Sequence, residues 1–344
     1  MRRVIGATVL AATAALLGTT VPGPALAAPE TAKQLGTPLE VTGFILDSSS
    51  TALLEREAGA LATASVAGIA LKRSGAAVTE PTDDDTKMIG PAHEWEIDAE
   101  LLVSNFSSKT YEFDSEAAAK LLRDEENIVN VADQIAGFVS TQGWDSVNVD
   151  LESLHRKDGP GLTLLVQELQ ARMPEEKTVT VDLMSADSPA GYRDGGYQLA
   201  ALADAADVLV LMSYDLHGPS WSGPGPIGPL RWQKQVLEAL LEVVPAQQVD
   251  LGIAGYGYSW PKHGTGKSYT VKAARQLIKK NGGKAEWKPK IGEWRAKLKS
   301  GTEIWYSDGR SFDRRYDLAL DYGLHGVALW RLGSGDTLVD EPVR

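Results

Sequence analysis

Cysteine is absent from this chain of 344 residues. Its absence excludes disulfide bonds, zinc held by thiolates, a thiol nucleophile and a lipid anchor on an N-terminal Cys. Histidine is scarce, and the five His residues form neither a close metal-ligand pair nor a His-Glu-x-x-His motif. The sequence contains no G-x-S-x-G elbow, which argues against a serine esterase. We therefore expect no metal site.

Signals for a phosphate-bearing cofactor are also lacking. A G-x-G-x-x-G spacing at 223–228 contains Pro224 and Pro226. Proline has no backbone N–H, so these positions cannot face a pyrophosphate as the motif requires. We expect no cofactor.

Basic residues are fewer than acidic ones, with 34 Lys and Arg against 46 Asp and Glu and a formal net charge of −12. Such an acidic surface argues against binding to nucleic acid or to anionic lipid. A neutral polysaccharide remains compatible with it.

Long apolar runs are confined to the N-terminus. Arg2 and Arg3 precede an apolar run over 4–17, and Ala25-Leu26-Ala27 follows, which together form the three parts of a secretory signal peptide. The run is too short and too rich in Ala and Thr for a membrane span. We expect cleavage after Ala27, secretion, a mature N-terminal segment over 28–39, and no attachment to a membrane after cleavage.

From about residue 40 the apolar pattern alternates between short strands and helices, which is typical of a parallel α/β sheet. Eight such strands predict a (β/α)8 TIM barrel with its active site at the C-terminal strand ends. We expect strands at 41–46, 66–71, 100–104, within 143–152, and at 179–184, 208–212, 249–255 and 326–331. The expected helices lie at 51–62, near 87–92, and at 115–122, 128–139, 162–172, 197–205 and 232–244.

The connection between the last two strands is longer than a loop and helix require, at about 70 residues. Within it, 272–280 reads as a helix, and 286–288 and 303–307 read as strands. We therefore predict one catalytic barrel over 40–344 that carries a small α+β insertion at about 262–310. We expect a monomer.

The stretch 143–152, Gly-Trp-Asp-Ser-Val-Asn-Val-Asp-Leu-Glu, is the most informative part of the chain. As a strand, it would bury its Val and Leu side chains on one face and direct Asn148, Asp150 and Glu152 together to the other. Two acids and an amide inside a protein are costly unless they meet a ligand or each other. The alternative is a half-exposed edge strand, although such polar faces more often use Thr, Lys and Ser.

This stretch resembles the signature of glycoside hydrolase family 18, the chitinase-like (β/α)8 barrels, which reads Asp-Gly-x-Asp-x-Asp-x-Glu. The matching positions hold Asp145, Ser146, Asn148, Asp150 and Glu152. Ser146 replaces the family's Gly, and Asn148 replaces the first inner Asp of many chitinases. The branch of bacterial spore-cortex and cell-wall hydrolases commonly reads Asn-x-Asp-x-Glu, and the chain resembles that branch most closely.

Further segments support the resemblance in the family's order. Leu-Met-Ser-Tyr-Asp at 211–215 is similar to the family's Met-x-Tyr-Asp motif. His217 with the Gly- and Pro-rich segment 223–230 resembles the cell-wall branch, as do 304–308 and 326–333. Any one of these segments alone would be weak evidence.

The resemblance implies substrate-assisted retaining chemistry, in which the substrate's acetamido oxygen attacks the anomeric carbon. Glu152 would be the general acid and base, and Asp150 would orient the acetamido N–H and stabilise the developing positive charge. Tyr214 would donate to the acetamido carbonyl, and Asp215 would contact a sugar hydroxyl. Asn148 cannot share a proton with Asp150 and would only hydrogen-bond its neighbours.

Other residues are candidates for binding sugar. Trp330 would form an apolar floor beneath the reacting ring, with core packing as the alternative. Met212 belongs to the motif that contains Tyr214 and Asp215. For Tyr214 and Asp215 the alternative is a turn and a helix cap. Tyr256 and Trp221 would line outer subsites or pack, and the same choice applies to three further aromatic residues, Trp144, Tyr258 and Trp260.

The sequence thus predicts a secreted hydrolase that cleaves β-1,4 bonds of a polysaccharide containing N-acetylglucosamine. Chitin, peptidoglycan and the core of N-linked glycans all contain the required 2-acetamido sugar, and the sequence does not choose among them. The alternative is a chitin- or glycan-binding lectin on the same barrel, a class that typically lacks the acid present here as Glu152. An extracellular solute-binding protein would usually show two lobes and often a lipidated Cys, and neither is found.

Overall fold

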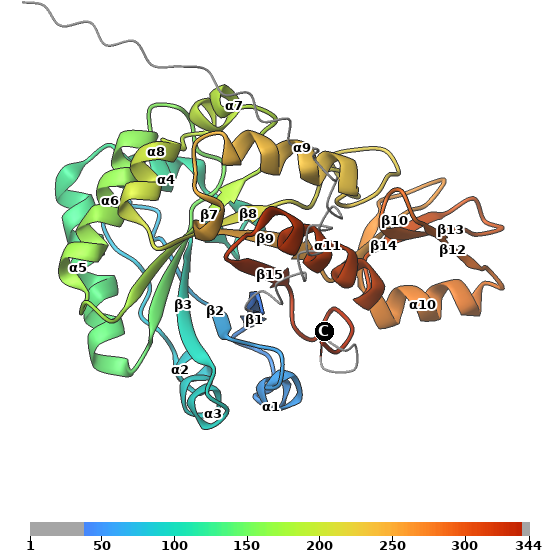
Figure 1. Ribbon diagram of the computed structural model, residues 1–344, viewed down its shortest axis with the longest axis horizontal. Coiled ribbons are helices and arrows are strands. Elements are labelled where there is room, and N and C mark those ends of the chain that lie inside the picture. Colours follow the sequence, from blue (N-terminus) through green and yellow to red (C-terminus); the bar gives the residue numbers. More distant parts are fainter. Residues whose placement is uncertain (1–37, 339–344) are drawn as a thin grey trace, which may run out of the picture. The chain divides into compact units, whose positions relative to one another are not determined.

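A closed barrel of eight parallel strands forms the centre of the computed structural model, which describes residues 38–338 (Figure 1). Neighbouring strands follow the order β1-β15-β9-β8-β7-β6-β3-β2. The TIM-barrel prediction is therefore confirmed, whereas the predicted signal peptide lies outside the described residues. The strand bounds are β1 Glu40–Leu46, β2 Thr63–Ala70, β3 Asp98–Ser104, β6 Ser146–Asp150, β7 Thr178–Met184, β8 Val208–Met212, β9 Val249–Ala254 and β15 Gly326–Trp330.

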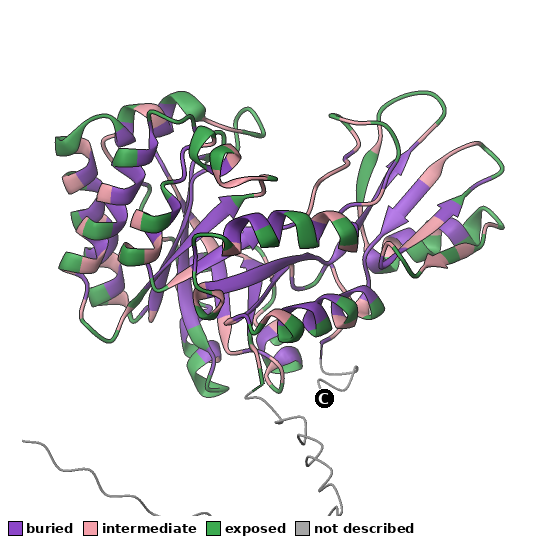
Figure 2. Cartoon of the chain, turned by 45° about the horizontal axis from the view of Figure 1, so that its top comes forward, coloured by how far each residue is buried: buried purple, intermediate pink, exposed green. Residues whose placement is uncertain are grey.

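Helices surround the barrel and bury one side each, while their outward sides are exposed (Figure 2). Their apolar faces, the outward side chains of the strands and several loop residues form the main hydrophobic core. The helix bounds are α1 Ala52–Glu57, α2 Asp83–Thr86, α3 Ile89–Glu94, α4 Ser115–Leu122, α5 Glu125–Gln142, α6 Gly159–Arg172, α7 Pro189–Asp194, α8 Leu199–Ala205, α9 Leu230–Leu241 and α11 Gly309–Tyr322.

The end of α5 shows how local sequence sets the approach to β6. The Asp124 side chain caps the helix start by accepting from the Asn127 N–H. Gly143 ends the helix with a φ of 92°, a left-handed conformation that glycine adopts at little cost. Trp144 follows and is fully buried in the main core, so it is a packing residue.

The insertion between β9 and β15 is a five-stranded sheet with one helix packed on it (Figure 1). Its elements are β10 Tyr256–Trp260, β11 Lys267–Thr270, α10 Val271–Lys280, β12 Ala285–Lys288, β13 Glu293–Lys297 and β14 Glu303–Tyr306. An α+β insertion at this place was expected. The sheet begins at Tyr256, directly after β9, because β10 pairs with β14 and β11 rather than continuing the barrel.

Several element boundaries differ from the predicted ones. The first helix ends at Glu57 rather than at 62, and α5 extends beyond the predicted 128–139 at both ends. Two short helices, α2 and α3, stand where one helix near 87–92 was expected. The first of them starts earlier, because Thr82 and Asp85 make a capping box. A two-stranded hairpin after β3, with β4 at Phe106–Ser107 and β5 at Glu112–Phe113, was not predicted.

The interior of the barrel contains both apolar and polar side chains. Phe44, Leu102, Val210 and Ala328 form a small apolar cluster with Trp330 packed against it. β6 and β7 contribute buried polar side chains, among them Asn148, Asp150 and Asp182.

Candidate active site

The inner face of β6 carries polar side chains into the barrel. Val147 and Val149 belong to the outer core between strands and helices. Because side chains alternate along a strand, Asn148 and Asp150 point inward, where both are buried. Glu152 comes two residues after Asp150, beyond the C-terminal end of the strand. The alternation read from the sequence thus places these groups as expected.

A neighbouring loop residue holds the backbone of Glu152 on both sides. The Glu152 N–H donates to Asn105 Oδ1 at 2.9 Å, and Asn105 Nδ2 donates to the Glu152 carbonyl at 2.9 Å. Asn105 directly follows β3 and is buried. Sequence reasoning missed this residue, although a polar side chain at the end of a barrel strand was a usable signal.

A cavity of about 480 Å³ opens beyond the ends of β6, β7 and β8. It brings together four of the predicted site residues, namely Glu152, Met212, Tyr214 and Asp215. Met184 at the end of β7 and Trp232 on α9 add apolar surface to its lining. Residues from three strand ends and a helix therefore meet Glu152 in one space large enough for a sugar ring.

Asp215 is fixed by two tyrosines of the insertion. Tyr256 and Tyr258 both donate their hydroxyls to Asp215 Oδ1, Tyr258 at 2.9 Å. Asp215 itself has a φ of 60°, in the left-handed region that few residues other than glycine adopt. Tyr256, predicted to bind sugar, is buried and its hydroxyl is engaged with Asp215. The Tyr258 hydroxyl is likewise engaged with Asp215, and the sequence left the choice between sugar binding and packing open for this residue.

The two remaining aromatic candidates occupy different places. Trp330 packs on Phe44 inside the barrel, with ring centroids 5.3 Å apart, and also contacts the aromatic cluster that includes Tyr256. Its half-buried ring ends β15 and is not among the residues that line the cavity with Glu152. Trp221 is 55% exposed, stands edge-on to the Tyr258 ring, and donates from Nε1 to the Asp215 carbonyl at 3.2 Å.

Burial and like charge make the carboxyls of this site weak acids. Burial raises the pKa of Glu152, and the charges of Asp150 and Asp215 raise it further. Burial also raises the pKa of Asp150, which a hydrogen bond from Ser104 partly opposes. Burial and nearby carboxylates hold the pKa of Tyr214 well above its usual value. A protonated Glu152 can therefore serve as an acid near neutral pH, and Tyr214 keeps its proton to donate.

Two further buried acids, not predicted from sequence, lie on the strands beside β6. Asp182 on β7 accepts from Asn148 Nδ2 at 3.0 Å. Glu100 on β3 accepts from Thr180 at 2.9 Å and from Ser146 at 3.3 Å. The serine that replaces the family's glycine therefore bonds to an acid that lies deeper in the barrel.

Asp145, the first acid of the signature, lies away from this group. It bonds to His93 Nε2 at 2.6 Å, to Lys177 Nζ at 3.0 Å and to the Ala99 N–H at 2.9 Å. These contacts lie before β6 begins, so Asp145 ties the start of the strand to its neighbours rather than facing the cavity.

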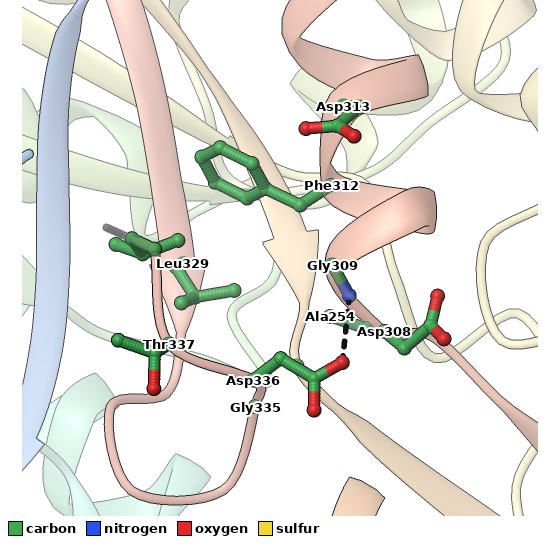
Figure 3. A pocket seen from close by; sticks show the side chains of 11 residues that line it. Ala254, Asp308, Gly309, Phe312, Asp313, Leu329, Gly335, Asp336 and Thr337 are labelled. Carbon is green, nitrogen blue, oxygen red and sulfur yellow. Dashed lines mark hydrogen bonds between the residues drawn. The ribbon is translucent and has the colours of Figure 1, made fainter. Parts of the chain in front are cut away.

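A second, much smaller cavity of about 10 Å³ lies between β9, β15 and the start of α11 (Figure 3). Asp308 and Asp336 beside it are both bonded to Arg275 at 2.6 Å, and the Gly309 N–H donates to Asp336. The space accommodates about one water molecule and its charges are paired, so it is not a substrate site.

Two searches of residues 38–338 bear on other kinds of site. No group of three His, Asp or Glu side chains in this range has an arrangement that could hold a metal ion. None of the helices there has the length and apolar character to cross a membrane.

Comparison with known proteins gives several related glycosylases. An uncharacterized glycosylase of Bacillus subtilis, YvbX, is 26% identical over 262 residues, covering 73% of this chain and 76% of the relative. The cortical fragment-lytic enzyme of Bacillus anthracis is 23% identical over 275 residues, which cover 76% of this chain. Only 62% of that enzyme's length is spanned.

Solved structures share the fold. The chitinase of Chromobacterium violaceum superimposes with a TM-score of 0.75 at 25% identity, covering 87% of this chain and 95% of the chitinase. The spore cortex-lytic enzyme SleL of Bacillus cereus gives 0.76 at 21% identity, over 87% and 72% of the two chains. The family model for glycosyl hydrolases family 18 matches residues 110–335. Because this match covers most of the chain and the fold and the order of motifs agree with it, the chain belongs to glycosyl hydrolases family 18.

Proposed function

We propose that this chain is a secreted glycoside hydrolase that cleaves β-1,4 bonds of a polysaccharide containing N-acetylglucosamine. The observation that carries the proposal is the position of Glu152. Its side chain reaches the large cavity, its backbone is clamped by Asn105, and burial together with neighbouring charge raises its pKa. A carboxyl group in that state is a general acid that retains its proton near neutral pH.

In the first step, Glu152 donates its proton to the glycosidic oxygen and the bond from that oxygen to C1 breaks. The carbonyl oxygen of the sugar's own 2-acetamido group attacks C1 and closes a positively charged oxazolinium ring. The Asp150 carboxylate stabilises this charge and orients the acetamido N–H, while the Tyr214 hydroxyl donates to the acetamido oxygen. No second carboxylate needs to act as a nucleophile.

In the second step, water attacks C1 on the opposite side to the acetamido oxygen, and the ring reopens. The Glu152 carboxylate takes the proton released by the water, which restores the acid for the next cycle. Two inversions at C1 leave the product with the anomeric configuration of the substrate. Trp330 supports the reacting ring, Asp215 and Met212 line its surroundings, and Trp221 is available for a neighbouring sugar.

The identity of the polysaccharide is part of the proposal. The relatives include proteins named as chitinases and as cortical fragment-lytic enzymes, which favours chitin or peptidoglycan strands. The negative charge of the chain is compatible with a neutral glycan. N-terminal sequencing of protein recovered from culture medium tests secretion, and the proposal expects a chain that starts at residue 28.

The test of the activity uses the purified chain with chitooligosaccharides, colloidal chitin and purified peptidoglycan. Mass analysis should reveal shortened products from at least one substrate, and proton NMR of the first product should show the retained β-anomer. Inverted product would contradict substrate-assisted chemistry. Binding without cleavage of any of the three would instead identify a lectin.

A further inference from the structure

Two acids face each other across the seam between β6 and β7. The register of these parallel strands pairs Asn148 with Thr180 and Val149 with Val181. Asp150 and Asp182 are the next residues of the two strands, and both point into the barrel because Val149 and Val181 pack outside it. Neighbouring strands lie about 4.8 Å apart, so these two carboxyls are side by side.

Asp182 is 3% exposed, and it accepts a hydrogen bond from a neutral amide, that of Asn148. Asn148 Nδ2 donates to Asp182 Oδ1, so that oxygen acts as an acceptor and the other oxygen is free to carry a proton. On the facing strand, Asp150 Oδ1 is buried and has no hydrogen-bond partner. Asp182 can therefore carry a proton on its second oxygen, and Asp150 Oδ1 is an acceptor that lacks a donor.

The titratable side chains around Asp182 are carboxyls and tyrosines. The titratable groups that act on it or feel its charge are Asp150 on β6, Glu152 after β6, Glu100 on β3, Tyr214 after β8 and Tyr197 before α8. None of these is a cation. Two ionised carboxylates this close, with no cation facing them, are strongly disfavoured in a buried site.

We propose that Asp182 works as a neutral, protonated carboxylic acid that donates a hydrogen bond to the Asp150 carboxylate and so positions it. This inference rests on the proposed function, because Asp150 is the group that faces the acetamido nitrogen there. Asn148 does not take this task, since its amide bonds to Asp182 Oδ1 and to the Glu100 carboxyl. Asp182 is therefore a positioning residue, and it acts through Asp150.

The electrostatics agree with this assignment. Burial and the charge of Asp150 hold the pKa of Asp182 well above its usual range. A carboxylic acid kept neutral by its surroundings is a good hydrogen-bond donor, as known enzyme sites illustrate. The negative charge of the pair then resides on Asp150, next to the place where the proposed reaction develops positive charge.

The kinetic test compares two substitutions of Asp182 with one of Asp150. Asp182→Ala removes the donor and should lower kcat by roughly 10²-fold, the usual cost of losing one aligned donor to a charged group in a catalytic site. Asp182→Asn presents an amide N–H in place of the carboxyl proton and should recover most of that loss. Asp150→Asn should show no such recovery, because its carboxylate charge is what the reaction needs.

A spectroscopic test does not depend on turnover and covers a variant that folds poorly. Infrared spectra at neutral pH should contain the C=O stretch of a protonated carboxylic acid in the wild type. The Asp182→Asn variant should lose that band, whereas Glu152→Gln, which removes a different protonated carboxyl, should retain the Asp182 contribution.

The two tests separate the possible failures. If the wild-type chain cleaves no glycan, the proposed function fails, and the infrared band still decides whether Asp182 is protonated. If Asp182→Asn is as damaging as Asp182→Ala, or if no band is lost in Asp182→Asn, the neutral-donor role of Asp182 is overturned.

Discussion

Two buried carboxyls of this molecule, Glu293 and Asp150, differ in their hydrogen-bond partners. Glu293, on β13 of the insertion, accepts from the backbone N–H groups of Ile227 and Gly228 at 2.9 and 2.7 Å and from Arg315 Nη2 at 3.3 Å. Asp150, on β6, is also buried, but none of the hydrogen-bond donors around it reaches its Oδ1. The first acid joins the insertion to α11 and the loop after β8, and the second faces another acid.

This difference distinguishes an acid with a structural role from the acid to which the proposed reaction gives a catalytic role. Burial raises the pKa of Glu293, but the Arg315 charge and two backbone donors oppose the effect. The titratable neighbours of Asp150 are themselves acids, Glu152 and Asp182, and burial raises the pKa of both. Burying a carboxylate without a cation destabilises the folded chain. Such an arrangement is typical of active sites, where a ligand or a developing positive charge compensates for it.

The largest expected effect is on activity at the unpaired acid. Asp150→Asn should lower kcat by about 10³-fold, because the amide cannot stabilise positive charge on the substrate. The same change removes an incompletely solvated charge, so thermal stability should be unchanged or higher. Steady-state kinetics and calorimetry on one preparation measure both. A large loss of stability would place Asp150 in the same class as Glu293.

The paired acid should show the reverse behaviour. Glu293→Gln leaves Arg315 as a buried guanidinium without a counter-charge, which should cost about 3 kcal/mol of unfolding free energy. Urea denaturation measures this loss. At a temperature where the variant is folded, kcat should match that of the wild type, since Glu293 does not line the large cavity. A matching loss of kcat would mean that the two regions are not separate.

The pH dependence of stability tests the raised pKa values of the two acids on β6 and β7. The pKa of Asp150 and that of Asp182 are raised in the folded chain, so between about pH 5 and pH 8 the folded state binds more protons than the unfolded state. Their contribution to stability therefore falls as the pH rises. The Asp150→Asn and Asp182→Asn variants should lose less stability over this range than the wild type, by urea titration at each pH. An equal or steeper loss would contradict the raised values.

Asp215 lies between the two classes and should give the smallest effect. It has two hydroxyl donors, and Tyr258→Phe removes one while Tyr256 remains bonded. We expect a rise in KM of about fivefold with little change in kcat, because one hydrogen bond to a charged group is lost and the acid Glu152 is untouched. Tyr322→Phe, on the outer surface of α11, is a matched control that also loses a tyrosine-carboxylate bond. A similar KM change in the control would argue against a role for Asp215.

Much of the fold was predictable because the barrel repeats one physical pattern. Alternating apolar strands and amphipathic helices identify β8 over 208–212 and α4 over 115–122 at their observed bounds. The five-stranded sheet was harder to predict, since β11 and β13 are short and contain charged and polar residues. In addition, β10 enters the sheet by pairing with β14, which is distant in the sequence.

The site was predictable where its residues lie in one strand and not where they come from different strands. Asn148, Asp150 and Glu152 share a face within five residues, so their alternation is visible in the sequence. Asp182 sits in the apolar run of β7, and its proximity to Asp150 follows only from the strand register. Asn105 is a single polar residue after β3 whose partner, the Glu152 backbone, is 47 residues away.

The central claim is that the unpaired acids at the end of β6 perform the chemistry, with Glu152 as the proton donor. Its most direct test is Glu152→Gln, measured for turnover of a chitooligosaccharide and for equilibrium binding of the same molecule by calorimetry. The account predicts that turnover is lost while binding stays within a few fold of the wild-type affinity. Hydrolysis at the wild-type rate by this variant would contradict the role of Glu152 and the proposed activity with it.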